Sequence, residues 1–365
     1  MYLALREMRF AKARYSLIAT IMVLIAFLVL FITGLAQGLA YDNASSVQNM
    51  AATHFVLEQG SNHRFTRSQV DHAKLEAAER IVGKNNAELL GLRMTTVVPF
   101  GGTKKVDVTI LAVEPDGWLS PAVITGSSLS ADAAGQVMVD QKLSEEGVSI
   151  GTILVDQPSG TKFTVSGFVR NESFSHAPVV FVNQRDWLAI QSQADQPVYN
   201  AIAIKGATAQ GSELQAALPG MEVIKKSAAV SAIPGYKEEQ GTLTMMIVFL
   251  FIISAFVLAV FFYVITIQKT SQFGILKAIG ARTAYLARSV TLQVLVLSVG
   301  SLVLSGILVR LFEIALPESM PFRLGSSTFV WTSAVFIAMS VSGSLFSVWK
   351  VARIDALDAI GRAAA

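Results

Sequence analysis

Residues 233–288 read IPGYKEEQGTLTMMIVFLFIISAFVLAVFFYVITIQKTSQFGILKAIGARTAYLAR. Within this stretch, Leu243–Ile267 is a run of 25 residues without a charge. A helix that crosses the hydrocarbon core needs about 20 apolar residues, so this run is long enough to span a membrane. Acidic and aromatic residues precede the run, and a basic segment follows it. The stretch therefore predicts a spanning helix between an outer polar region and an inner basic one.

The composition indicates a protein that is part membrane-embedded and part globular. Of its 365 residues, 52% are hydrophobic and only 15% are charged. This is too apolar for an ordinary soluble protein and too mixed for a bundle made only of spans. The chain has no cysteine, which excludes disulfides, thiolate metal sites and cysteine nucleophiles.

Four uncharged runs are long enough to span, at Leu17–Ala40, Leu243–Ile267, Val290–Val309 and Phe329–Val348. The short segments that must share one side of the membrane hold 11 Lys and Arg against three acids. The positive-inside bias places this side, and with it both termini, in the cytoplasm. The large segment between the first two runs is then extracellular.

These patterns predict a membrane α-helical fold with four transmembrane helices and a mixed α/β extracytoplasmic domain between helices 1 and 2. The predicted segments are a cytoplasmic interfacial helix (1–15), the first span (16–40), the extracellular domain (41–240), the second span (241–267), a cytoplasmic coupling segment (268–287), the third span (288–316), an extracellular hairpin (317–327), the fourth span (328–349) and a cytoplasmic tail (350–365). The start of the chain also resembles a cleaved signal peptide, but its apolar run is longer than the usual signal core.

Short β-rich runs and apolar periodicity give the expected elements of the extracellular domain. We expect strands at His54–Gln59, Glu88–Val98, Val106–Val113, Gln136–Asp140, Thr152–Val155, Phe163–Val169, Val179–Val182, Ala201–Ile204 and Met221–Ile224. Helices are expected at Arg67–Gly83, Gln184–Gln193 and Gly211–Ala217. The domain is expected to form one mixed unit, with two lobes as a further possibility.

Enzyme chemistry is not indicated by the sequence. There is no Gly-rich phosphate loop that ends in Lys-Ser or Lys-Thr, and no Ser/His/Asp or His-x-x-x-His pattern with suitable spacing. The spans also carry almost no charge, which argues against an ion-coupled transporter. We therefore expect no catalytic residue and no intrinsic cofactor.

One stripe of residues combines polar and apolar groups at helical spacing. Tyr236, Glu239, Leu243, Met246 and Leu250 are separated by steps of three and four, so they share one face if the helix extends back to Tyr236. A phenol, a carboxylate and a thioether are groups that can bind iron or anchor a polar ligand. The alternative is an interfacial Tyr and Glu with Met as packing filler.

Two glycines at the end of the first span are spaced for close helix packing. Gly34 and Gly38 lie four residues apart, with the polar Gln37 between them. Such a face allows another helix to approach closely. Packing within the chain and association with a second copy are both compatible with this spacing.

The segment between the second and third spans predicts a short cytoplasmic helix. Phe273, Leu276 and Ile279 recur at helical spacing beside Lys277, and Gly280 is placed to end the helix. Exposed apolar residues at this position require a covering surface. We expect them to dock onto a partner surface, with an interfacial helix on lipid as the alternative.

The order of elements and the motif FGILKAIGAR resemble the permease subunits of MacB/FtsX-type ATP-binding-cassette (ABC) systems over the whole chain. Three further stretches are most similar to heme-exporter permeases of the Hrt type: GLAQGLAYDN (Gly34–Asn43), SFSHAPVVFVN (Ser173–Asn183) and IPGYKEEQGTL (Ile233–Leu243). DevC-like glycolipid exporters share the layout. Phe174 stands where some relatives have a tyrosine, which is a departure from the pattern.

The resemblance implies a homodimeric permease with two separate ATPase subunits that hydrolyse ATP. It implies heme as the transported ligand, without a nucleic-acid partner, and turns the stripe into a binding wall formed by Tyr236, Glu239, Met246, Leu250, Gln37 and Gly38. The implied iron ligands are Glu239, Tyr236 and Met246, with His176 and Met94 as the second choice. The implied function is ATP-driven export of heme from the membrane. The alternatives are an FtsX-like signalling protein that controls a cell-wall enzyme, and an exporter of another lipid-like amphiphile.

Overall fold

The computed structural model describes residues 12–191, 198–206, 211–317 and 320–352 of the chain. The chain divides into two compact units. Residues 1–38 and 241–365 form one, called here the helical unit, and residues 39–240 form the other, called the sheet domain. Most of the predicted interfacial helix at 1–15 and most of the predicted tail at 350–365 lie outside the described residues.

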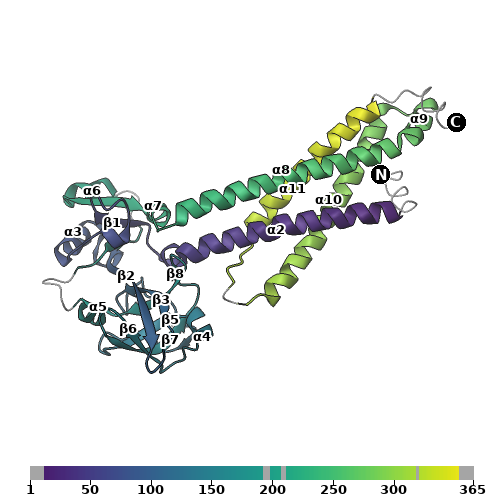
Figure 1. Ribbon diagram of the computed structural model, residues 1–365. Helices are drawn as coiled ribbons and strands as arrows, with labels where there is room; N and C mark the ends of the chain where they lie inside the picture. Colours follow the sequence, from purple (N-terminus) through teal and green to yellow (C-terminus); the bar gives the residue numbers. More distant parts are fainter. Residues whose placement is uncertain (1–11, 192–197, 207–210, 318–319, 353–365) are drawn as a thin grey trace. The chain divides into compact units, whose positions relative to one another are not determined.

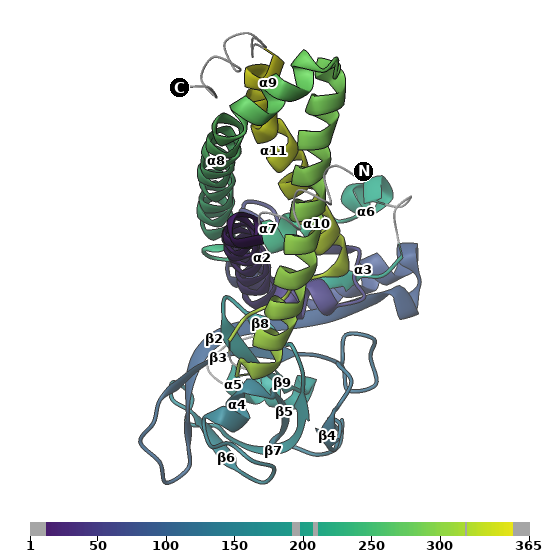
Figure 2. The same ribbon diagram turned by 90° about the vertical axis from the view of Figure 1, so that its right-hand side faces the viewer.

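Long apolar helices make up the helical unit. They are α2 (Lys12–Asn49), α8 (Tyr236–Gln268), α10 (Thr283–Ala315) and α11 (Ser326–Ala352), and the short α9 (Thr270–Ala278) follows α8 directly. In the described part of the chain, four helices are long and apolar enough to cross a membrane. Helices α10 and α11 pack against each other (Figures 1 and 2). The core of the unit holds Met22, Leu30 and Phe336, which are fully buried.

Helix α8 contributes least to the packing of its own unit. Only 17% of the residues in its most apolar stretch are buried, against 39% for α2 and 44% for α10. Large side chains such as Phe249, Ile253 and Phe256 are more than half exposed. Helix α8 therefore offers a broad apolar surface to lipid or to another protein chain.

A mixed sheet forms the scaffold of the sheet domain. Its strands are β1 (His54–Glu58), β2 (Ala87–Pro99), β3 (Val106–Ala112), β4 (Thr125–Gly126), β5 (Gln136–Asp140), β6 (Ile153–Asp156), β7 (Lys162–Val169), β8 (Ser173–Phe174), β9 (Ala177–Val182), β10 (Ala201–Ile204) and β11 (Met221–Lys225). The main order is β11-β1-β10-β2-β3-β9-β5-β7-β4. Strand β2 pairs with β10 at one end and with β3 and β6 toward the other, so this long strand joins two lobes of the domain (Figure 1).

Helices cover the sheet and are held by buried apolar residues. Helices α3 (His72–Val82) and α6 (Gly211–Ala217) supply Ala78, Val82 and Leu214 to one hydrophobic core. The short α4 (Lys142–Glu145), α5 (Gln184–Ile190) and α7 (Lys226–Ser231) complete the domain, together with single 3-10 turns at Phe65–Arg67 and Lys84–Asn86. The last turns of α2 place Ala44 and Val47 in a second core, where both are fully buried. This burial explains why α2 continues to Asn49, well beyond its apolar run.

The predicted fold class is confirmed, and each predicted strand of the sheet domain corresponds to an observed one. The differences concern short elements, among them helices α4 and α7, which were not predicted. The predicted helix Arg67–Gly83 begins only at His72, because Asp71 caps it by accepting a hydrogen bond from the Lys74 backbone. Strands β4 and β8 have two residues each and were not predicted.

Candidate functional site

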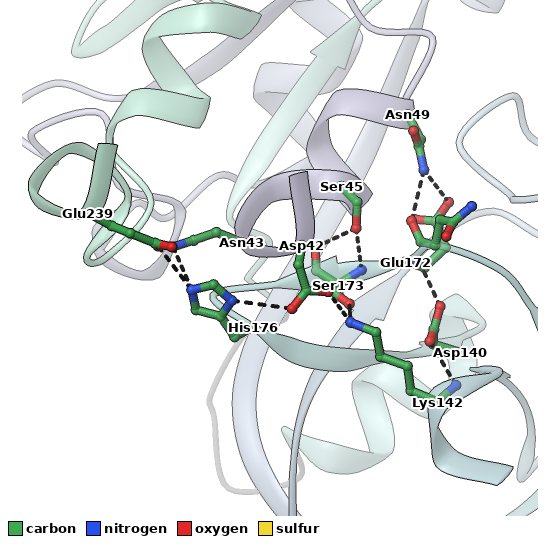
Figure 3. Close-up of polar contacts among 11 residues, drawn as sticks. Asp42, Asn43, Ser45, Asn49, Asp140, Lys142, Glu172, Ser173, His176 and Glu239 are labelled. Carbon is green, nitrogen blue, oxygen red and sulfur yellow. Dashed lines mark hydrogen bonds and ion pairs between the residues drawn. The ribbon is translucent and has the colours of Figure 1, made fainter. Parts of the chain in front are cut away.

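The imidazole of His176 lies between two carboxylates in the sheet domain (Figure 3). Its Nδ1 is 3.2 Å from Oδ2 of Asp42, and its Nε2 is 3.0 Å from Oε2 of Glu239. Asn43 donates from Nδ2 to the same Glu239 oxygen at 2.7 Å. The group of Asp42, Asn43, His176 and Glu239 is called here the His176 cluster. It joins the last turns of α2, the β8–β9 turn and the first turn of α8.

The backbone of the β8–β9 turn places His176 in this position. Ser173 and Phe174 pair with Pro178 and Ala177, which leaves Ser175 and His176 as a two-residue turn. Both have positive φ, 50° and 64°, as a type I′ hairpin turn requires. Asn and Gly are the residues that normally occupy such turns, so Ser175 and His176 hold an unfavourable conformation. The Ser175 N–H donates to the Asn43 carbonyl at 2.7 Å, which ties the turn to α2.

The charges of the cluster favour a protonated His176. Hydrogen bonding to Asp42 raises the pKa of His176, burial opposes the increase, and Glu239 adds to it. Lys142 forms an ion pair with Oδ1 of Asp42 and donates to the Ser173 hydroxyl at 3.0 Å. Asp42 and Glu239 therefore flank His176, and Lys142 is a second basic group at Asp42.

One oxygen of Glu239 has no hydrogen-bond partner in the described part of the chain. Its Oε1 is buried and has no hydrogen-bond partner among the described residues. Such an atom carries a desolvation cost that a bound cation or a hydrogen-bond donor would remove. Glu239 is thus positioned by His176 and Asn43 through Oε2, while Oε1 can bind an additional group. A carboxylate oxygen in this state is a suitable ligand for ferric iron or an acceptor for an acidic proton.

The structure divides the other residues of the predicted wall into two groups. Tyr236 begins α8 and packs against the second core of the sheet domain, so it is half-buried. Met246 and Leu250 follow on the same continuous helix, inside the helical unit, where Met246 is 42% exposed. Tyr236 and Glu239 belong to the sheet domain, whereas Met246 and Leu250 belong to the helical unit.

The end of the first span packs within its own chain. A side chain at Gly38 would meet the Pro321 carbonyl oxygen at 2.1 Å, and one at Gly34 would meet the Phe322 ring at 2.5 Å. Gln37 is exposed and donates to the Thr328 hydroxyl at 2.5 Å. Of the two roles open for these glycines, the structure favours packing within the chain. The glycine face is covered by the segment before α11 and is not free for a second copy.

Two other residues from the sequence lie away from the cluster. Met94 is exposed on strand β2, and no described contact connects it with His176. Phe174, which stands where some relatives have a tyrosine, is buried against Phe65 in the second core. Its ring stabilises the domain and does not face a ligand.

The predicted coupling residues do not share one exposed surface. Phe273 is buried in a small core with Leu286 and Val290 of α10, and Leu276 packs against it. Ile279 is 76% exposed, and Lys277 is half-buried. The expectation that Phe273 faces a partner is therefore wrong, because its side chain attaches α9 to α10. Ile279 is the residue of this set that is free to contact another protein.

A buried pair of acids lies close to the cluster. Glu172 is 6% exposed, and burial raises its pKa to about 8, with Asp140 adding to the shift. Asn49 of α2 donates to Glu172 Oε1 at 3.2 Å, and Asp140 accepts from the Glu172 backbone N–H at 2.7 Å. The Glu172 carboxyl is therefore mostly protonated at neutral pH. It forms a second polar connection between α2 and the strands.

The residues that sequence reasoning missed are Asp42, Asn43 and Lys142. The first two follow the apolar run of α2 as the first strongly polar pair, which is the signal that could have indicated them. Lys142 has no such signal, because only the fold brings it to Asp42. Notably, Asp42 and Asn43, His176 and Glu239 come one from each of the three stretches with Hrt-type resemblance, and the fold brings all three together (Figure 3).

Two solved structures are similar to about half of this chain. The extracellular domain of the noncanonic ABC-type transporter YknZ from Gram-positive bacteria matches with a TM-score of 0.36 and 11% identity, covering 47% of this chain and 100% of that one. The periplasmic region of MacB from Actinobacillus actinomycetemcomitans matches with a TM-score of 0.38 and 11% identity, covering 51% of this chain and 92% of that one.

Sequence comparisons cover the full chain. Residues 244–356 match the family model of the FtsX-like permease C-terminal domain. The putative hemin transport system permease proteins HrtB of Staphylococcus haemolyticus and Staphylococcus epidermidis are 29% and 30% identical, each over 99% of both chains. An uncharacterized ABC transporter permease of Mycobacterium bovis is 25% identical over the same shares. The chain is therefore an ABC transporter permease of the FtsX-like family, in the group that includes the HrtB proteins.

Proposed function

We propose that this chain is the permease subunit of an ATP-driven exporter that removes heme from the membrane. The observation that carries the proposal is the free, buried Oε1 of Glu239 at the start of a helix whose following turns are apolar and exposed. A planar ligand with an iron centre and an apolar rim matches this combination. The similarity to HrtB proteins, which are named for hemin transport, supports the same cargo.

The polar end of the proposed heme wall consists of Glu239 and Tyr236. Glu239 supplies a carboxylate oxygen without a protein partner, and Tyr236 lies one helical turn before it. His176 and Asn43 hold the other Glu239 oxygen, so they position the ligand group instead of binding iron themselves. His176 becomes available as an iron ligand only after its hydrogen bonds to Asp42 and Glu239 break.

The apolar part of the proposed wall consists of Met246 and Leu250 on the same helix face, with Gln37 from the first span as a further polar contact. Burying a few hundred Å² of apolar porphyrin surface would contribute several kcal/mol to the binding free energy, at about 25 cal/mol per Å². Gly38 is no longer part of this wall, because Pro321 covers it. Axial ligation then fixes the orientation of the ligand more than it adds affinity.

A homodimer with two ATPase subunits is the proposed assembly. The exposed apolar surface of α8 supports it, since this helix has the least burial within its own chain. A second copy packed along α8 would cover the proposed wall and close a space for the ligand. The ATPase subunits would bind from the side of α9, where Ile279 is exposed. By the charge bias of the short segments, both termini and α9 are cytoplasmic and the sheet domain is extracellular.

Heme binding by variants tests this proposal. We expect Glu239→Ala and Tyr236→Ala protein from heme-replete cells to show a shifted Soret band or reduced heme occupancy, and the cells to become heme-sensitive. Glu238→Ala is the matched control, because it removes the same group from the neighbouring position on another face of the helix. Equal membrane levels of all variants exclude a folding effect. Wild-type spectra and heme tolerance in both single variants and in the double variant would remove this wall as the site.

The sheet domain also has a feature that favours the signalling alternative. A groove of about 790 Å³ is lined by Trp118, Leu188 and Tyr199, with charged residues at its rim. Its volume lies in the range of ligand-binding clefts. If the chain controls a cell-wall enzyme, Leu188→Asp should abolish that control and leave heme tolerance unchanged. If Leu188→Asp instead lowers heme tolerance and causes no cell-wall phenotype, the function of the chain is export.

A further inference from the structure

A lysine is buried at the junction of α8 and α9. Lys269 follows the last residue of α8 and precedes the first residue of α9, and it is only 4% exposed. Its Nζ donates to the Tyr15 hydroxyl at 2.6 Å and lies 3.5 Å from Oε1 of Gln293. The Tyr15 hydroxyl in turn donates to Gln293 Oε1 at 2.8 Å. These three residues, called here the Lys269 triad, connect the beginning of α2, the α8–α9 junction and α10.

The triad is a buried polar group. Tyr15 and Gln293 are 5% and 6% exposed, and the Lys269 ammonium lies 5.1 Å from the centroid of the Tyr15 ring. A cavity of about 20 Å³ adjoins the triad and is lined by apolar residues such as Phe262 and Leu297. This volume holds about one water molecule.

Such a residue is not explained by stability. Transfer of a cation to an apolar interior is costly, and a well-packed apolar side chain of similar size usually serves at least as well. Charged groups buried in the helices of membrane proteins therefore mark functional positions. In the sequence, Lys269 belongs to the basic segment after the second span and was interpreted only as a sign of orientation. Its burial is a property of the fold that the sequence does not show.

The position of Lys269 indicates what the triad does. Its backbone N–H bonds to Ile265 of α8, and its carbonyl accepts from the Phe273 N–H of α9, so one residue belongs to both hydrogen-bond ladders. Phe273 of α9 also packs against Leu286 and Val290 of α10. A displacement of α9 must therefore move Lys269. Through the triad, it must also move α2 and α10.

We propose that Lys269 is a positioning residue that transmits movement of α9 to α2, α8 and α10 as one body. This inference rests on the proposed coupling of α9 to an ATPase subunit. Without the ammonium, α9 could still move, but α2 would no longer follow it. ATP hydrolysis would then continue while α2 stayed at rest.

Lys269→Met is the variant that tests the proposal. Methionine has a similar length and no charge, and the Tyr15–Gln293 hydrogen bond can persist without the lysine. Thr266→Val is the matched control, because Thr266 lines the same cavity and bonds only to the carbonyl of Phe262 in its own helix. Tyr15→Phe removes a single oxygen and breaks the same connection if Lys269→Met fails to insert into the membrane.

The readout uses the absence of cysteine from the chain. A fluorophore on Leu28→Cys, an exposed position of α2, reports movement of that helix in the complex with its ATPase subunit. We expect ATP with vanadate to change the emission in the wild-type and Thr266→Val backgrounds and not in Lys269→Met. Hemin exported per ATP should fall roughly tenfold or more in Lys269→Met, a coupling loss of ordinary size, while ATP turnover stays within about twofold of wild type.

Two outcomes separate this inference from the proposed function. If the wild-type complex exports no hemin but the fluorophore still responds to ATP, the cargo is wrong and the triad is still tested by its emission change. If Lys269→Met and Tyr15→Phe both respond and export like wild type, the triad does not transmit movement and the inference is refuted.

Discussion

Glu172→Gln should change how the stability of the protein depends on pH. Burial keeps the Glu172 carboxyl protonated in the folded state up to a pKa of about 8, whereas the unfolded chain releases that proton near 4.5. Between these values the folded state binds the additional proton, so the free energy of unfolding falls as pH rises. At 1.36 kcal/mol per pKa unit, the full window corresponds to a ceiling of about 5 kcal/mol. Glutamine keeps the oxygen that accepts from Asn49 and cannot ionise, so it removes this loss.

Denaturation of the full chain in detergent at pH 5 and pH 8.5 measures the effect. We expect Glu172→Gln to unfold with nearly wild-type free energy at pH 5 and to be more stable than wild type by a few kcal/mol at pH 8.5. Glu145→Gln, at an exposed position of α4, is the matched control and should show no such difference. An identical wild-type-to-variant difference at both pH values would refute the assignment of Glu172 as a buried neutral acid.

The remaining predictions concern packing, coupling and orientation. Gly38→Ala should destabilise the protein by about 1–3 kcal/mol, because the new methyl group meets the backbone of Pro321. Gly300→Ala is the control, because its methyl group meets open space and should not destabilise the protein. Thermal unfolding in detergent compares the two variants. Ile279→Asp should uncouple ATP hydrolysis from transport without lowering stability, and normal transport by this variant would show that Ile279 is not part of the docking surface. A cysteine at Ser128 should react with an impermeant maleimide on intact cells, and one at Ser271 only after lysis; labelling of the second from outside would reverse the orientation.

The sequence predicted the large elements because their signals are local. A charge-free run such as Leu243–Ile267 has few structures available to it in a membrane, and β-branched runs of four to eight residues indicate strands directly. The β8–β9 turn could not be predicted in this way. Ser175 and His176 adopt positive φ without glycine or asparagine, so the turn has no sequence signal. The tertiary contacts of that turn hold it in place.

The candidate site was predicted in part, since Glu239 and His176 were both named as candidate iron ligands. The fold brings His176 Nε2 to 3.0 Å from Glu239 Oε2. The two residues are far apart in sequence, and no local sequence pattern indicates that they meet. The same limit applies to Phe273, whose helical spacing with Ile279 does not reveal that one faces α10 and the other solvent. Periodicity identifies a face of a helix, but the surrounding elements decide what covers it.

Transfer of hemin by the purified complex tests whether this chain belongs to a heme exporter. The complex of this chain with its ATPase subunit is reconstituted in lipid vesicles loaded with hemin, and apomyoglobin in the medium on the side of the sheet domain reports its release by a Soret change. We predict transfer that requires ATP, persists in Glu238→Ala and is lost in Glu239→Ala while ATP hydrolysis continues. ATP hydrolysis without any hemin transfer by the wild-type complex would contradict the account.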